Sequence, residues 1–165
     1  MHRAKIRSRK SRVASFYFDA LEVGNYWGCF EGEQRRYHHT APISLVYALR
    51  QSLTAVAREG LDKMVKRHQT NAQLLYSTVE GLGLKMFVED KAIRLPCLHT
   101  VRVPEGVEWK EVQSKLMAGG IEIAGGLGPT LGKIWRIGTF GVNSNPEIIA
   151  KLGKALSTAL DATQR

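Results

Sequence analysis

The sequence predicts an α+β protein, in which helices are followed by a small ββαββα domain whose mainly antiparallel sheet carries helices on one face. Two long runs of apolar residues at spacings of three and four come before Gly83, and shorter apolar segments of strand length follow it. A final helical pattern closes the chain. Helices that precede a set of short strands are typical of the α+β class rather than of a parallel α/β fold.

The first half of the chain is expected to be helical. The aromatic stretch 15–28 is consistent with a short helix, followed by a polar loop. Thr40, with Pro42 just after it, is a helix start signal, and the apolar positions that follow predict a helix as far as Glu59. A second apolar stripe over 61–82 predicts another helix that ends between two glycines.

The second half mixes strands with helices. The sequence predicts strands over 84–88, 98–103, 121–123 and 134–140, and a helix over 109–117. Ser144 and Glu147 have the spacing of a capping box, with Pro146 in the first turn, so a last helix is expected to begin there.

The positive charge of the protein is concentrated at one end. The chain has 165 residues and a net charge of +9, with 24 bases and 15 acids. Six of the bases fall in residues 1–12, and the remaining 18 nearly balance the acids. Such an acid-free segment fits a transit peptide, a nuclear-import patch or a solvated surface segment. We favour the surface segment, because its apolar residues lack helical spacing, and we expect no nucleic-acid partner.

A membrane partner is not expected either. The longest apolar stretch, Ala41 to Leu49, is interrupted by Pro42 and Ser44 and is much shorter than the roughly 20 residues that span a bilayer. No secretory apolar segment is present, so an intracellular protein is expected. The pattern does not distinguish peroxisomal, mitochondrial and cytosolic locations.

The sequence predicts no metal site. Cys29 and Cys97 lie far apart without a C-x-x-C spacing. His38 and His39 are adjacent, so their side chains point in different directions, and no third ligand follows at a recognisable spacing.

Tyr37 and Thr40 are candidate anion ligands. They lie just before the predicted helix at Pro42, and a helix N-terminus exposes unpaired N–H groups and the positive end of the helix dipole. Together with a hydroxyl and a phenol this end could hold a phosphate. Alternatively, Thr40 only caps its helix.

Arg136 and the glycine-rich segment before it form a second candidate region. The run from Gly125 to Lys133 lacks the spacing of a phosphate loop and precedes a strand, which favours a flexible turn. Strand alternation places Arg136 on the face of Ile134 and Gly138, in a largely apolar setting. A buried arginine often has a carboxylate partner, so we expect either an internal Asp or Glu or the acid group of a substrate to bind this guanidinium.

Three segments together resemble one enzyme family. The runs NYWGCFEGEQRRYHHTAPISLVYALRQSL, EGLDKMVKRH and IEIAGGLGPTLGKIWRIGTFG are similar, in order and spacing, to the C-terminal part of the alanine–glyoxylate and serine–pyruvate aminotransferases. These are class V, fold-type I pyridoxal-phosphate enzymes, and the 3-hydroxykynurenine transaminases belong to the same group. The resemblance covers nearly the whole chain.

The resemblance implies a role for each candidate residue. Tyr37 and Thr40 would bind the phosphate of the pyridoxal phosphate held by the other subunit of a homodimer. Arg136 would bind the α-carboxylate of a small amino acid or 2-oxo acid, and Gly126 would lie near that substrate. Residues 1–58 would be the end of the large-domain chain with the connecting helix, and residues 59–165 the small C-terminal domain.

The resemblance also implies that one catalytic group is missing. The lysine that forms a Schiff base with the cofactor belongs to an upstream part of the family sequence, and no lysine of this chain matches its motif. We therefore expect a fragment or truncated gene product without catalytic residues of its own, inactive in isolation. The alternative is a non-catalytic short isoform that pairs with a full-length subunit.

Overall fold

The computed structural model describes residues 3–163. Met1 and His2 of the basic segment, and the last two residues, therefore fall outside the described residues. The chain forms two compact units, Met1–Ala55 and Val56–Arg165, and the division falls within one helix. Within residues 3–163 we find no helix with the length and apolar character that crossing a bilayer requires.

The first unit contains short helices and an extended loop. Helix α1 covers Arg3–Arg7 and α2 covers Ala20–Tyr26, with a 3-10 turn at Phe16–Phe18 between them. The side chain of Asp19 caps α2 by accepting from the N–H of Leu21. The single predicted helix over 15–28 is thus two elements. Helix α3, Ile43–Glu59, begins in this unit, and none of its side chains is buried.

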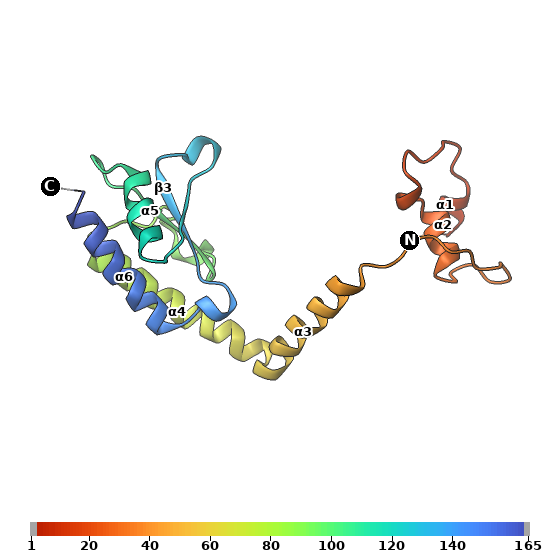
Figure 1. Cartoon of the computed structure of the whole chain (residues 1–165), viewed down its shortest axis with the longest axis horizontal. Coiled ribbons are helices and arrows are strands. Elements are labelled where there is room, and N and C mark those ends of the chain that lie inside the picture. The colour runs from red at the N-terminus through yellow and green to blue at the C-terminus, as the bar shows by residue number, and fades with distance from the viewer. Residues whose placement is uncertain (1–2, 164–165) are drawn as a thin grey trace. The chain divides into compact units, whose positions relative to one another are not determined.

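The second unit has the α+β architecture that the sequence predicts (Figure 1). Its helices are α4 (Leu61–Gly81), α5 (Trp109–Ala118) and α6 (Pro146–Asp161). Its three strands are β1 (Leu98–Arg102), β2 (Ala124–Gly125) and β3 (Ile134–Gly138). All strand pairs are antiparallel, in the order β1-β3-β2.

The helices cover one face of this sheet. The strands β1 and β3 pair His99 with Ile137 and Val101 with Trp135. Because side chains alternate along a strand, these four residues lie on the same side of the sheet. These four side chains are all buried. The core on that side is completed by side chains of the three helices: Ala72, Leu75, Tyr76, Val79, Val112, Leu116, Ile149, Leu152, Leu156, Ala159 and Leu160.

Three local predictions need correction. The segment 84–88 forms only an isolated bridge, between Met86 and Val101, instead of a full strand. The strand expected over 121–123 begins at Ala124 instead. Helix α6 is capped by Asn145, whose side chain accepts from the N–H of Glu147, and not by Ser144. Ser144 is buried and accepts from the side chain of Asn71.

The contact between α4 and α6 depends on a small residue. A Cβ atom built on Gly153 would lie 2.6 Å from the methyl group of Thr78. That methyl is fixed, because the hydroxyl of Thr78 donates to the carbonyl of Leu74 at 2.8 Å. The close approach of the two helices therefore requires glycine at position 153.

Replacing Gly153 with alanine is expected to lower the free energy of unfolding by about 1–3 kcal/mol, the usual cost of overpacking a core. Adding Thr78→Ser removes the methyl group and should restore most of the lost free energy of unfolding. Urea denaturation followed by circular dichroism measures both. Gly81→Ala is the matched control, because a Cβ there meets open space. An unaltered midpoint for the Gly153 variant would show that the helices pack less closely than described.

Candidate functional site

Arg136 lies on the central strand, on the face of the sheet opposite the helices. It pairs with Thr100 of β1 and Ala124 of β2. Its neighbours Trp135 and Ile137 point into the core, so alternation turns Arg136 to the other side, where it is half-buried. The predicted position of this arginine is therefore the observed one.

The guanidinium of Arg136 is held by a carbonyl instead of an acid. Its Nε donates to the carbonyl oxygen of Gly125 at 2.7 Å. Among residues 3–163, no carboxylate lies within ion-pair distance of Arg136, and its two terminal amino groups have no hydrogen-bond acceptor. The internal Asp or Glu partner that the sequence left open is therefore not found there, and the terminal nitrogens remain as donors for an external carboxylate.

Trp109 fixes the strand that holds this guanidinium. A Cβ on Gly125 would lie 2.3 Å from the ring of Trp109, so the ring packs directly against that backbone. The carbonyl of Trp109 accepts from the indole of Trp135 at 3.1 Å. Both residues therefore position the Gly125 carbonyl, and sequence reasoning missed them because nothing in the pattern brings the start of α5 to β2.

Gly126 closes the loop that follows β2. Its Cβ would lie 2.0 Å from the carbonyl oxygen of Thr130, and the hydroxyl of Thr130 accepts from the N–H of Leu127 at 3.0 Å. The tight loop explains why glycine is needed here. A contact between Gly126 and substrate stays a prediction.

Tyr37 and Thr40 are brought together in the first unit. The Tyr37 hydroxyl and Thr40 Oγ1 lie 2.6 Å apart, and both residues are exposed. Helix α3 begins at Ile43, so Thr40 lies three residues before it and its hydroxyl bonds to Tyr37. The first N–H groups of a helix lack intrahelical acceptors. Two hydroxyls beside such an end are a donor set that suits a phosphate.

Asn25 organises the loop that leads to Tyr37, a role that no sequence pattern indicates. Its side chain is buried, donates to the carbonyl of Gln34 at 3.0 Å and accepts from the N–H of Arg36 at 2.8 Å. Arg35 adds two hydrogen bonds to the carbonyl of Tyr26. Helix α2 therefore fixes the backbone just before the candidate phosphate ligands.

The two histidines between Tyr37 and Thr40 bond to each other and to the backbone. His38 Nε2 lies 2.9 Å from the carbonyl of Phe16, so this nitrogen carries the proton. His38 Nδ1 then accepts from His39 Nδ1 across 2.7 Å when His38 is neutral. In the described part of the chain, no three His, Cys, Asp or Glu side chains gather as metal ligands.

The lysines of the chain all lie at or near the surface. None of them is buried, and Lys115, the most enclosed, forms an ion pair with Glu111 on the next turn of α5. A lysine that acts as a nucleophile needs a site that keeps its amine neutral, such as a desolvated pocket. Nothing in residues 3–163 gives a lysine such a site.

The chain matches one known protein family over most of its length. The model of the aminotransferase class-V family matches residues 3–143. The chain belongs to this family. Its fold is that of the same group, and this confirms both the resemblance and the fold class predicted from the sequence.

Individual relatives agree with this family. The chain is 45% identical over 159 residues to the alanine–glyoxylate aminotransferase of Oryctolagus cuniculus, a match over 96% of this chain and 40% of that protein. The crystal structure of an alanine–glyoxylate aminotransferase from Nostoc sp. superposes with a TM-score of 0.81 at 44% identity, over 95% of this chain and 41% of that one. The crystal structure of a ureidoglycine–glyoxylate aminotransferase from Bacillus subtilis superposes with a TM-score of 0.83 at 33% identity, over 96% of this chain and 40% of that one. The chain thus spans about two fifths of these relatives.

Proposed function

We propose that this chain is part of a pyridoxal-phosphate-dependent aminotransferase that moves an amino group from a small amino acid, alanine or serine, to a 2-oxo acid such as glyoxylate or pyruvate. The proposal is supported by membership of the class-V family and by the similarity to alanine–glyoxylate aminotransferases. When bound, pyridoxal phosphate supplies the electron sink for the chemistry at the amino group. The residues of this chain bind the cofactor phosphate and orient the substrates.

The observation that carries the proposal is that the two terminal nitrogens of the Arg136 guanidinium have no hydrogen-bond acceptor in the described chain. Its Nε is held by the Gly125 carbonyl, and its terminal nitrogens have no acceptor among the described residues. A guanidinium binds a carboxylate through two parallel hydrogen bonds. Amino acids and 2-oxo acids share an α-carboxylate, so one arginine can orient both substrates of a transamination.

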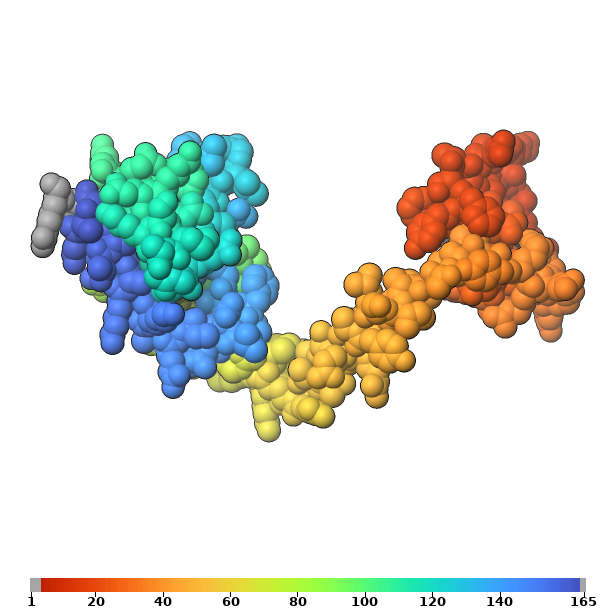
Figure 2. Space-filling view, viewed as in Figure 1, coloured from red at the N-terminus to blue at the C-terminus, as the bar shows by residue number. Residues whose placement is uncertain are grey.

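Tyr37 and Thr40 are proposed to bind the phosphate of a cofactor held by a partner subunit. The 2.6 Å hydroxyl pair and the adjacent helix end fit a phosphate. Helix α3, which follows directly, exposes an apolar surface that a homodimer partner would cover, with Ile43, Val46 and Leu49 each more than half exposed. Figure 2 shows the side chains of α3 uncovered on the visible face.

The lysine that holds the cofactor is proposed to lie outside these 165 residues, because no lysine here is buried. The purified chain should therefore form no pyruvate from alanine and glyoxylate when pyridoxal phosphate is added. A chimera in which this chain replaces the matching segment of the Nostoc enzyme should be active. Transamination by the purified chain alone would contradict this division of roles.

In that chimera, Arg136→Gln is expected to raise the KM for the amino donor by about 10- to 100-fold, since a charge-assisted bond contributes about 1.5–3 kcal/mol. Steady-state kinetics with alanine checks this. Arg102→Gln is the matched control, because Arg102 is an exposed arginine of the same sheet that pairs with Glu89. Equal KM values for the two variants would show that Arg136 does not bind the substrate.

A second candidate function is a non-catalytic chain that pairs with a full-length subunit. The exposed apolar residues of α3 favour it, because a monomer rarely leaves such a stripe in water. Co-expression with a tagged full-length enzyme of the same family tests it. Recovery of a heterodimer would support the pairing, and a strictly monomeric chain would exclude it.

A further inference from the structure

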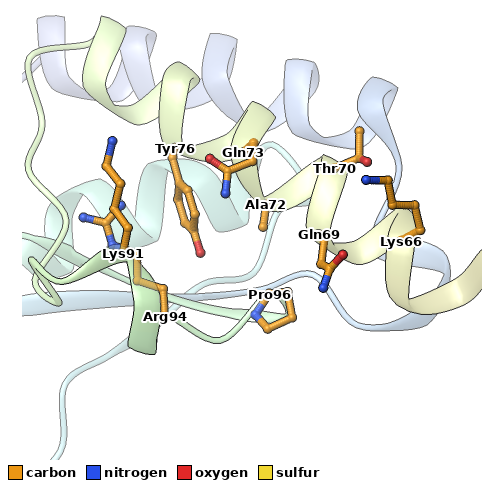
Figure 3. A pocket seen from close by; sticks show the side chains of 9 residues that line it. All are labelled: Lys66, Gln69, Thr70, Ala72, Gln73, Tyr76, Lys91, Arg94 and Pro96. Atoms are coloured by element: carbon orange, nitrogen blue, oxygen red, sulfur yellow. The ribbon is translucent and has the colours of Figure 1, made fainter. Parts of the chain in front are cut away.

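A pocket in the second unit is lined by positive charge and contains no acid. It lies between α4 and the 3-10 turn Lys91–Ile93 and has a volume of about 410 Å³. Its polar lining consists mainly of three cations and three neutral donors: Lys66, Lys91, Arg94, Gln69, Thr70 and Gln73. Figure 3 shows Lys66 at one end of the pocket and Lys91 with Arg94 at the other, with the amide of Gln73 between them.

The charge of Arg94 is not neutralised within the described chain. Its Nε and one terminal nitrogen donate to the carbonyls of Val88 and Glu89, at 2.7 and 3.1 Å. The other terminal nitrogen is buried without a hydrogen-bond partner. Carbonyls carry no net charge, so the guanidinium keeps its full positive charge beside the pocket.

The two acids that precede Lys91 are engaged elsewhere, and Asp62, one turn of α4 before Lys66, does not line the pocket. The carboxylate of Glu89 pairs with Arg102 at 3.2 Å, and that of Asp90 caps the 3-10 turn by accepting from the N–H of Ala92. Among residues 3–163, neither Lys66 nor Lys91 forms an ion pair. Three like charges around one hollow repel each other unless an anion lies among them.

Tyr76, which forms the inner wall, adds no negative charge. Its ring lies under the guanidinium of Arg94, 4.9 Å from centroid to Cζ, and its hydroxyl lies 3.4 Å from the carbonyl of Leu95. Burial raises the pKa of this phenol, so it stays protonated at neutral pH. The pocket therefore has a cationic rim and a neutral aromatic wall.

We propose that this pocket binds a small molecule through its phosphate group. A carboxylate is bound best by the planar fork of an arginine, and here two nitrogens of that fork are taken by carbonyls. Lysine ammonium groups act as point charges and suit a compact tetrahedral dianion. The volume exceeds what one phosphate needs and falls in the range of small-molecule sites, so the ligand is an organic phosphate.

The test is calorimetric titration of the purified chain with inorganic phosphate, with succinate as the carboxylate comparison. We expect phosphate to bind and succinate to bind at least several-fold more weakly. The double variant Lys66→Gln/Lys91→Gln should lose about tenfold or more in phosphate affinity, because the positive charge that attracts the anion is removed from both ends of the pocket. Circular dichroism verifies that the variant keeps its helices, as expected for exposed lysines.

The matched control is Lys133→Gln/Lys154→Gln, which removes the same net charge from exposed positions of the same unit that do not line the pocket. Phosphate affinity unchanged from the wild-type chain in this control, together with the loss in the pocket variant, supports the site. Equal losses in both double variants would show general attraction to a basic protein. That result, tighter binding of succinate, or no binding of phosphate would each overturn the proposal.

Discussion

Replacing Trp135 with alanine is expected to lower the free energy of unfolding by about 3–5 kcal/mol, the usual cost of truncating a buried aromatic residue. Trp135 is fully buried at the centre of the three-stranded sheet, where it pairs with Val101 on one side and Gly125 on the other. Its indole N–H also donates to the carbonyl of Trp109. The substitution therefore opens a cavity and leaves a carbonyl without its donor.

Urea denaturation followed by circular dichroism at 222 nm measures this loss without relying on tryptophan fluorescence. Trp135→Phe should fall between the wild type and alanine, because the ring keeps much of the packing but not the hydrogen bond. Trp27→Ala is the matched control: Trp27 is 68% exposed, and surface substitutions usually change stability by less than about 0.5 kcal/mol. If Trp135→Ala cost no more than the control, the sheet would not be packed as described.

The long helices could be predicted from the sequence because their signal is local. Helices α3 and α4 repeat apolar residues over several turns, and their observed bounds lie within a few residues of those expected. The short strands were harder to predict from the sequence. Alternation indicates that 84–88 is extended, but not that only Met86 finds a bridge partner, because strand pairing depends on residues distant in the chain.

The candidate site was predictable in part for the same reason. Alternation along β3 placed Arg136 on the correct face, since side-chain direction in a strand follows from the backbone alone. The sequence could not show that a carbonyl, and not an acid, holds its Nε. That bond depends on the packing of Trp109 against Gly125, which joins two elements through space.

Acidification is expected to destabilise the second unit through His99. This side chain is buried, its Nε2 lies 2.8 Å from the hydroxyl of Thr139, and its Nδ1 has no hydrogen-bond partner. The ring packs edge-on against Tyr76, and the guanidinium of Arg94 lies over the ring of the same tyrosine. Burial lowers the pKa of His99 to about 4, because the charged imidazolium would be desolvated without a counter-ion.

The direction of the pH effect follows from this lowered pKa. In the unfolded chain the imidazole titrates near its ordinary value of 6.5, so between pH 6.5 and 4 the unfolded state binds a proton that the folded state does not. The contribution of His99 is fully present above pH 6.5 and falls by about 3 kcal/mol as the pH drops to 4.

Urea denaturation of the wild type and of His99→Gln, at several values from pH 7 to pH 4.5, isolates this contribution. Glutamine can still hydrogen-bond to Thr139 but does not titrate. Carboxylates such as Glu59, whose pKa is lowered by its hydrogen bond to Arg67, contribute equally to both proteins and cancel in the difference. The wild type should therefore lose stability faster than the variant below pH 6.5, and parallel curves would show that the buried histidine is not neutral in the folded state.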